Sequence, residues 1–236
     1  MKTLIIIPAY NEEENIKKLI EDVVSSEPHA KILVIDDGSS DRTGTVARET
    51  KKADIITLPH NLGIGGAVQT GFKYARRNNY DVVVRVDGDG QHRADQIKKI
   101  LQPILERETD VTIGSRFLNI LTRHHNFIRR IGQKTISSLI SLIIRQNITD
   151  ATSGFRCYNK DAIELLNQYY PSDYPEPEEI IFCKKNNLKI KEVGILMKER
   201  EKGASSLTAI NSVYYMIKVI LSILINILRT PTMIKK

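Results

Sequence analysis

The 236-residue chain has few of the residues that mark several protein classes. Its two cysteines, Cys157 and Cys183, lie far apart and without metal-ligand spacing, which argues against a disulfide framework and predicts two reduced thiols. Tryptophan is absent, aromatic residues make up only 6%, and no zinc-finger spacing or aromatic ribonucleoprotein motif is present. The sequence therefore predicts no nucleic-acid partner.

Long hydrophobic runs are missing as well. The first 15 residues hold one lysine and a four-residue apolar run that leads straight into acidic residues, which is too short for a signal peptide. The most apolar stretch, residues 213–228, falls short of the ~20 residues that a membrane-spanning helix needs, and it contains Lys218 and Asn226. These absences predict a protein that is made and kept in the cytoplasm.

Positive charge is in excess. Lys and Arg number 35 against 28 Asp and Glu, which gives a net charge of +7 and a pI of about 9.3. A basic surface suits nucleic acid, an anionic membrane or phosphate-bearing substrates, and the missing nucleic-acid modules leave the last two. With 41% hydrophobic and 27% charged residues, the chain is typical of a globular protein, and its length suits one domain or one domain with a short appendage.

Short apolar runs alternate with helical patterns in the first half of the chain. The runs that predict buried strands are Leu4–Ile7, Ile32–Ile35, Ile55–Leu58, Val82–Val86 and Val111–Gly114. Between them we expect helices, one opening at Asn11 with Glu14 as its capping-box partner and another over 65–78. The alternation predicts an α/β fold with a mostly parallel sheet and helices on both faces.

Particular residues directly follow three of these runs. They are Pro8 after the first run, Asp36 and Asp37 after the second, and Asp87 and Asp89 after the fourth. Ligands of parallel sheets bind beyond the carboxyl ends of the strands. We therefore expect these residues to gather at one edge of the sheet.

The turn Asp87-Gly88-Asp89-Gly90-Gln91 carries two carboxylates two residues apart, on a backbone freed by glycine. Such oxygen ligands can reach one hard cation together, and they suit Mg²⁺ or Mn²⁺, which keep open positions for diphosphate oxygens. A cation bound there would neutralise a nucleoside diphosphate as it leaves. An ordinary acidic turn is the alternative interpretation.

Two further turns suit the rest of a nucleotide. A carboxylate of Asp36 or Asp37 can bind ribose hydroxyls or a base edge, and the same turn can cap a helix at residues 40–41. The glycines of 61–67, Gly65 among them, precede a helix and let backbone amides approach an anion. This segment matches neither the dinucleotide fingerprint nor a Walker loop.

Later in the chain, arginines and apolar helices prevail. Guanidinium forks suit phosphate oxygens, with solvated surface charge as the alternative for each. The arginines concerned are Arg116, Arg129, Arg130, Arg156 and Arg200. Residues 136–144 form an apolar helical stripe, and 213–228 form a more apolar run with basic flanks. That run is either a core helix or a helix in the membrane interface.

Several motifs occur together in one order. They are Ile-Pro-Ala-Tyr-Asn-Glu at 7–12, Val-Ile-Asp-Asp-Gly-Ser-Ser-Asp at 34–41, Asp-Gly-Asp-Gly-Gln at 87–91, Gly-Ser-Arg-Phe at 114–117 and Asp-Ala-Thr-Ser-Gly-Phe-Arg at 150–156. In this combination the sequence resembles the inverting glycosyltransferases of the GT-A fold, over residues 1 to about 206. It is most similar to polyprenyl-phosphate sugar transferases of the dolichol-phosphate-mannose-synthase type, whose Arg-x-x-Gly-x-Ser pattern is matched at 200–205. The run 174–178 looks like a bacterial branch that loads an N-acetylhexosamine or glucose onto undecaprenyl phosphate.

The resemblance implies a Rossmann-like GT-A catalytic domain over 1–206 and an apolar, basic-flanked membrane-association helix over 207–236. The residues implied in nucleotide binding are Pro8, Tyr10, Glu12, Asp36, Asp37, Gly65, Asp87 and Gly88. Those implied in binding Mg²⁺ or Mn²⁺ are Asp87, Asp89 and Gln91. The catalytic set is Asp89, Arg116, Arg129, Arg200 and Asp150, in which the arginines hold the lipid phosphate and Asp150 orients the acceptor.

The chain departs from the family pattern at two places near the expected acceptor. Gln133 stands where the family often has a serine, and Ser205-Ser206 stands where Ser-Lys is usual. Expected partners are a nucleotide-sugar donor, a polyprenyl-phosphate acceptor and the membrane surface at its cytoplasmic side. A small membrane partner protein and a homo-oligomer are also compatible with the resemblance.

Three functions remain to be compared. In the first, an acceptor phosphate, already ionised near pH 7, attacks the anomeric carbon in line without a strong general base, and configuration inverts. In the second, the sugar goes to a growing glycan or a protein hydroxyl, which needs a carboxylate base such as Asp150 or Glu178. In the third, the chain is an inactive nucleotide-sugar-binding scaffold, against which the intact Asp87-x-Asp89 pair argues.

Overall fold

The computed structural model describes residues 1–118, 127–172, 174–198 and 218–223, with only the backbone described for 127–130. Arg200, the Ser205-Ser206 pair and most of the membrane-association segment 207–236 fall outside these ranges. The backbone of Arg129 and Arg130 is described and their side chains are not.

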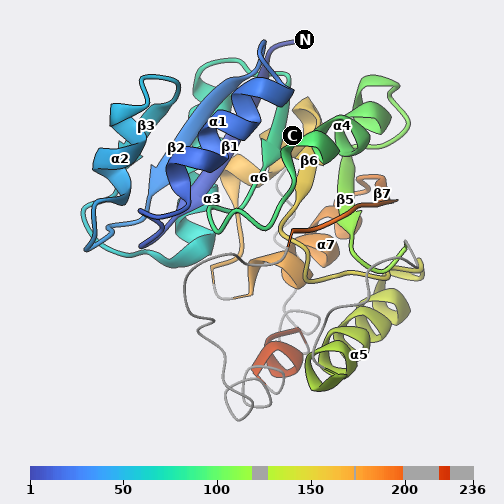
Figure 1. Cartoon of the computed structure of the whole chain (residues 1–236). Coiled ribbons are helices and arrows are strands. Elements are labelled where there is room, and N and C mark those ends of the chain that lie inside the picture. Colours follow the sequence, from blue (N-terminus) through green and yellow to red (C-terminus); the bar gives the residue numbers. More distant parts are fainter. Residues whose placement is uncertain (119–126, 173, 199–217, 224–236) are drawn as a thin grey trace.

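Seven strands form one sheet in the order β3-β2-β1-β4-β6-β5-β7 (Figure 1). The strands are β1 (Thr3–Ala9), β2 (Lys31–Asp36), β3 (Asp54–Thr57), β4 (Val82–Arg85), β5 (Val111–Ser115), β6 (Arg156–Tyr158) and β7 (Ile190–Gly194). All pairings are parallel except those of β6, which runs antiparallel between β4 and β5. The mostly parallel sheet and the five predicted strands are confirmed.

The sequence analysis missed strands β6 and β7. Strand β6 is only three residues long and begins with Arg156, so it lacks the apolar run that predicted the other strands. It owes its place to its two neighbours, which supply hydrogen bonds on both sides. Strand β7 has two consecutive charged residues, Lys191 and Glu192, which interrupt its apolar pattern, and it borders the sheet.

Helices cover both faces of the sheet, as predicted (Figure 1). They are α1 (Ile16–Ser26), α2 (Thr43–Glu49), α3 (Gly63–Arg77), α4 (Ile97–Leu105), α5 (Phe127–Ile144), α6 (Lys160–Gln168) and α7 (Pro175–Lys185). Strand β1 shows the two-layer core in its alternation, because Leu4 and Ile6 pack with α3, α5, α6 and α7 whereas Ile5 and Ile7 pack with α1, α2 and α4.

The predicted capping box at Asn11 is wrong. Helix α1 begins at Ile16, and Asn11 has a left-handed backbone with φ of 54°. Its side-chain oxygen accepts a hydrogen bond from the backbone amide of Ser40 at 2.9 Å. The asparagine thus joins two loops at the edge of the sheet, because Asn tolerates the left-handed region better than most residues do.

The described part of the C-terminal run packs against the body of the protein. Val219 and Ile223 are buried in the same core cluster as Ile136 and Ile140 of α5, while Leu221 is exposed (Figure 1). Within the described residues, no helix combines the length and apolarity that crossing a bilayer requires. The membrane-interface assignment of this run stays a prediction.

We expect both thiols to be inert in the native protein. Cys157 and Cys183 are unbonded, buried, and lie in core clusters on opposite faces of the sheet. Burial raises the pKa of each thiol, so little thiolate forms at neutral pH. Ellman's reagent should detect no fast-reacting thiol in the native chain and two in guanidinium. A fast native reaction would contradict this packing.

Candidate active site

The carboxyl ends of three strands are joined by backbone hydrogen bonds. The amide of Asp37, after β2, donates to the carbonyl of Ala9 in β1 at 2.9 Å. The amide of Gly88, after β4, donates to the carbonyl of Pro8 at 3.1 Å. The predicted gathering of strand ends is thus present, and it brings both acidic turns to one edge.

The turn after β2 fixes Asp36 below the surface. Its Oδ1 accepts the amide of Ser39 at 3.1 Å, and a Cβ at Gly44 in α2 would fall 2.3 Å from its Oδ2. Asp41 accepts the amide of Thr43 at 2.8 Å at the start of α2. The residue at the N-cap position of α2 is Arg42, which makes no side-chain capping bond, so neither Ser40 nor Asp41 is the N-cap; Asp41 lies one residue before it.

Asp37 points to the start of α3. Its Oδ1 accepts the amide of Leu62 at 2.8 Å, while the amide of Gly63 donates to Asn61 Oδ1 at 2.9 Å. Burial raises the pKa of Asp37, and the backbone amides nearby offset only part of that rise. One amide of the segment expected to meet an anion, that of Leu62, is therefore held by a carboxylate of the chain itself. Gly65 lies in the first turn of α3, where a Cβ would fall 2.5 Å from the carbonyl oxygen of Pro171.

Two other predicted nucleotide residues lie in the loop after β1. Tyr10 is 47% exposed, so its ring is open to a ligand. The Glu12 amide donates to Thr43 Oγ1 at 2.7 Å, and its Oε2 accepts Asn15 Nδ2 at 2.7 Å. These bonds fix the loop against α1 and α2, and the nucleotide roles of both residues stay predictions.

The acidic turn after β4 fits closely against β1. A Cβ at Gly88 would fall 2.9 Å from the carbonyl oxygen of Pro8, so only glycine fits there. Asp89 Oδ1 accepts the amide of Gln91 at 3.1 Å, which closes the turn. Gly90 has a φ of 71°, a backbone conformation that glycine adopts without strain.

Asp87 has two partners that the sequence analysis missed. Arg85 Nε donates to its Oδ1 at 3.0 Å, and its backbone amide donates to His92 Nδ1 at 3.0 Å. Burial acts to raise the pKa of Asp87, but Arg85, with smaller contributions from His92 and Arg116, lowers it by more, and the pKa lies below the ordinary value. Burial lowers the pKa of His92, which leaves the imidazole neutral. The available signal was an arginine two residues before Asp87 within a valine-rich strand.

The donor set of this turn fits Mg²⁺ or Mn²⁺. Among the described residues, no three His, Cys, Asp or Glu side chains cluster to hold a metal by themselves. The turn offers the carboxylates of Asp87 and Asp89 and the amide oxygen of Gln91. Mg²⁺ is typically held by one or two carboxylates, with water and substrate phosphates completing its shell. A structural zinc site, with four protein ligands, does not fit.

A segment after β7 crosses the acidic turn. Met197 pairs with His92 as an isolated antiparallel bridge, and the amide of Lys198 donates to the carbonyl of Gln91 at 2.9 Å. Lys198 Nζ donates to Asp22 of α1 at 2.9 Å. The chain that leads to Arg200 therefore departs from the edge of the proposed metal site.

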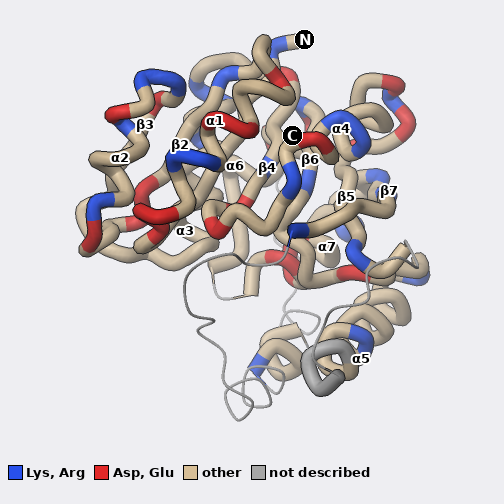
Figure 2. The backbone as a smooth tube through the Cα atoms, in the orientation of Figure 1, with Lys and Arg blue, Asp and Glu red and all other residues tan. Residues whose placement is uncertain are grey.

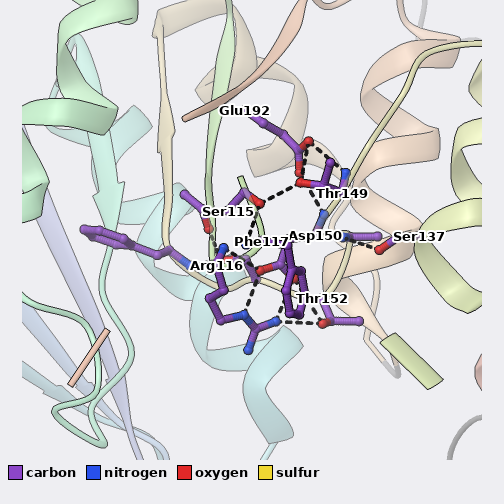
Figure 3. A network of polar contacts seen from close by, with 12 residues as sticks. Ser115, Arg116, Phe117, Ser137, Thr149, Asp150, Thr152 and Glu192 are labelled. Atoms are coloured by element: carbon purple, nitrogen blue, oxygen red, sulfur yellow. Dashed lines mark hydrogen bonds and ion pairs between the residues drawn. The ribbon is translucent and has the colours of Figure 1, made fainter. Parts of the chain in front are cut away.

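Arg116 and Asp150 form a buried bidentate pair (Figure 3). Arg116 Nε and Nη2 each donate to one carboxylate oxygen at 2.7 Å, and the backbone amide of Arg116 adds a bond of 3.0 Å. Arg116 Nη2 also donates to Thr152 Oγ1 at 2.8 Å. The structure thus brings together two residues of the predicted catalytic set, each as the other's partner.

Glu192 of β7 supports this pair from behind (Figure 3). Its two oxygens accept the amides of Thr149 and Asp150, each at 2.8 Å, while Thr149 Oγ1 lies 2.6 Å from Ser115 Oγ. Burial raises the pKa of Glu192. The sequence offered no signal for this role, because Glu192 is distant in sequence and lies in a strand that was not predicted.

A cavity of about 500 Å³ lies beside the network, between α5 and the loop before Asp150. Apolar and hydroxyl side chains line most of it, with one lysine: Phe117, Ile131, Lys134, Ser137, Ile148 and Thr149 are among them. Gln133, where the family pattern has serine, is buried in α5.

Arg156 does not have the predicted phosphate-binding arrangement. Its side chain is fully buried, and Nε donates to the carbonyl of Ser153 at 2.8 Å while Nη2 donates to the carbonyl of Glu176 at 2.9 Å. It joins the 150–156 motif to the start of α7, because antiparallel pairing of β6 directs it into the core. Both earlier interpretations, surface charge and phosphate ligand, are wrong for this residue.

The sequence motifs that meet at this edge belong to one family. The model of glycosyl transferase family 2 matches residues 4–166, which is more than half of the chain. The chain belongs to this family. The glycosyltransferase is 32% identical over 210 residues to the UDP-N-acetylglucosamine–dolichyl-phosphate N-acetylglucosaminyltransferase of Methanococcus voltae, covering 81% of this chain and 83% of that protein. It is 32% identical over 227 residues to the polyprenol monophosphomannose synthase of Mycolicibacterium smegmatis, covering 92% of this chain and 85% of that protein.

Solved structures confirm the GT-A fold. Mannosyl-3-phosphoglycerate synthase from Rubrobacter xylanophilus matches with a TM-score of 0.73 at 17% identity, covering 100% of this glycosyltransferase and 77% of that chain. Glucosyl-3-phosphoglycerate synthase from Mycobacterium tuberculosis, in complex with Mn²⁺, UDP and phosphoglyceric acid, matches with a TM-score of 0.71 at 17% identity. The match covers 98% of this chain and 80% of that chain. At this identity the likeness shows the fold alone.

Gly154→Ala should weaken Mn²⁺ binding. A Cβ at Gly154 would fall 2.3 Å from Asp87 Oδ2, so the methyl group must displace the carboxylate. We expect about a tenfold loss of Mn²⁺ affinity by electron paramagnetic resonance, on the scale of disturbed metal-ligand support. Gly71→Ala, whose Cβ would meet only Ile6 side-chain atoms, is the matched control and should bind Mn²⁺ normally. Equal affinities in all three proteins would place the metal elsewhere.

Asp150→Ala should destabilise the fold. It leaves the buried Arg116 guanidinium without its bidentate partner, a loss that typically costs about 3–5 kcal/mol. Urea unfolding measures the change in the free energy of unfolding. Asp161→Ala, at the exposed start of α6, is the control and should cost less than about 1 kcal/mol. A stable but inactive Asp150→Ala protein would instead assign Asp150 to the acceptor alone.

Proposed function

We propose that this glycosyltransferase moves a sugar, either N-acetylglucosamine or glucose, from a UDP donor to polyprenyl phosphate, with undecaprenyl phosphate as acceptor. The reaction takes place at the cytoplasmic face of the membrane and serves cell-envelope polysaccharide modification. It depends on Mg²⁺ or Mn²⁺.

One observation carries the proposal: the acidic turns after β2 and β4 are joined to β1 at a single sheet edge, in a family 2 chain. The relatives support the acceptor, since they are named for dolichyl phosphate, polyprenol phosphate and, in Micrococcus luteus, undecaprenyl phosphate at 32% identity. The Methanococcus voltae relative supports UDP-N-acetylglucosamine as donor.

Different residues of the sheet edge are suited to the nucleoside and to the cation. The turns at Asp36 and Asp37, with the open ring of Tyr10, are suited to the nucleoside, and Asp87, Asp89 and Gln91 would hold the cation. When bound, the cation offsets the charge of the leaving diphosphate. The acceptor oxygen is an ionised phosphate, so the protein has to orient two anions in line rather than remove a proton.

The contacts of the carboxylates favour a phosphate acceptor over a hydroxyl acceptor. A hydroxyl would need a general base within reach of solvent and substrate. Asp150 is fully buried and held by Arg116, and Glu178 is buried in α7 and accepts a hydrogen bond from Ser222 Oγ. Both carboxylates that could serve as that base are therefore engaged inside the protein.

The surface near α5 supports an anionic, membrane-bound acceptor. Among the described side chains of α5, residues 131–144, Lys134 is the one charged residue, and it is exposed (Figure 2). Leu142 and Ile131 of α5 are exposed at 77% and 51%. Exposed apolar residues beside an exposed lysine suit a membrane interface.

Organic-phase extraction tests donor and acceptor together. Membranes with undecaprenyl phosphate are incubated with a panel of labelled UDP- and GDP-sugars and Mn²⁺, and label should enter the organic phase from UDP-N-acetylglucosamine or UDP-glucose. Asp89→Asn should reduce this transfer at least a hundredfold, because it removes a carboxylate from the cation.

Asp95→Asn is the matched control, since Asp95 lies six residues along the same loop and pairs only with exposed Arg93 and neighbouring Gln96 in the described structure. It should transfer at the normal rate. Full activity of Asp89→Asn would refute the cation site. Label in polymer or protein, with none in lipid, would refute the acceptor.

A further inference from the structure

Behind the acidic turn lies a buried group of charges that the reaction, as described so far, does not use. Arg85 and Arg156 are register partners on β4 and β6, and both side chains are almost wholly buried. Like charges directly opposite each other destabilise a sheet. Three carboxylates compensate for them, those of Asp87, Glu176 and Glu179.

The guanidinium of Arg85 is fully engaged, with one partner for each nitrogen. Nε donates to Asp87 Oδ1 at 3.0 Å, Nη2 to Glu176 Oε1 at 2.7 Å and Nη1 to the Tyr170 hydroxyl at 3.3 Å. A planar fork with three fixed partners can hold a carboxylate in one orientation, which the single ammonium of a lysine cannot do.

Stability alone does not account for this arrangement. Replacing a buried ion pair by apolar residues of similar volume is often neutral or stabilising. Strand β4 is otherwise built of valines, so an apolar side chain at position 85 would suit the strand. An arginine there is therefore better explained by its effect on Asp87. Asp87 lies two residues further on, so in extended backbone the two side chains point to the same face.

We propose that Arg85 is a positioning residue for the metal-binding carboxylate of Asp87, and that Glu176 at the start of α7 holds Arg85 in place. The proposal rests on the proposed function, in which Asp87 binds the cation. Arg85 holds Oδ1, Gly154 leaves room beside Oδ2, and the carboxylate stays in the orientation that the turn needs.

The charge of Arg85 and its role in orienting Asp87 predict opposite effects on Mn²⁺ affinity, so an experiment can separate them. Arg85 is a positive charge close to the cation site, and removing it would by itself strengthen the binding of a divalent cation. If orientation dominates, removing the fork weakens binding, and a lysine that keeps the charge does not restore it.

The test is Mn²⁺ affinity by electron paramagnetic resonance, with and without UDP, on the full chain. We expect Arg85→Lys and Arg85→Met each to lower the Mn²⁺ affinity by about tenfold to a hundredfold, the range for residues that support metal ligands. Arg156→Lys is the matched control, because Arg156 is equally buried and makes no contact with Asp87 among the described contacts. It should lose stability while keeping Mn²⁺ affinity within about threefold.

Glu176→Gln and Glu179→Gln give a second pair that does not require replacing a buried arginine. Both residues lie in α7, but Glu176 contacts Arg85 directly, whereas Glu179 pairs with Arg156 and reaches Arg85 only through the Tyr170 hydroxyl. Glu176→Gln should weaken Mn²⁺ binding, and Glu179→Gln should weaken it much less. In the Arg85→Lys/Glu176→Gln double variant the losses should be less than additive, since both act on one carboxylate.

Any of three outcomes would overturn the inference alone. The first is Mn²⁺ binding by Arg85→Lys equal to that of the unsubstituted chain, and the second is tighter binding by Arg85→Met. The third is a loss of Mn²⁺ affinity in the Arg156→Lys and Glu179→Gln controls equal to that in the Arg85 and Glu176 variants. Absence of Mn²⁺-dependent UDP binding in the unsubstituted chain would instead overturn the proposed function, and this inference with it.

Discussion

The parallel pairing of β1 with both β2 and β4 is the constraint on which the rest of the site depends. The two backbone bonds that extend it, from Asp37 to Ala9 and from Gly88 to Pro8, bring two acidic turns into contact with one strand. Strand β1 has almost only apolar side chains, because it is covered on both faces. A buried strand therefore holds in place an edge whose own residues are polar.

Bringing carboxylates together has an electrostatic cost, and the fold offsets it from three directions. The amide of Leu62 before α3 meets Asp37, the guanidinium of Arg85 meets Asp87, and Arg116 meets Asp150. Glycines at 44, 88 and 154 make these approaches possible, since a Cβ at each would collide with a carboxylate or carbonyl oxygen. The glycines of the motifs thus serve close packing as much as backbone freedom.

The two halves of the site differ in how they are built. The nucleotide half comes from the ends of β1, β2 and β4, and each of its turns directly follows a strand that the local sequence predicts. The Arg116 half comes from β5, β7 and the 149–153 loop, which meet only in the finished sheet (Figure 3). Strand β6 separates the halves and carries Arg156, which ties the 150–156 motif to α7.

The sequence by itself determined the five apolar strands, the helices on both faces and the edge where Pro8, Asp36, Asp37 and Asp87 meet, because local apolar runs and strand ends report directly on a parallel sheet. Only the tertiary structure decided the place of β6, the true start of α1 and the partners of Asp87. Arg85, Glu176 and Glu192 could not be assigned from the sequence, since a charged side chain in a strand or helix shows its role only once its oppositely charged partner, up to 91 residues away, lies beside it.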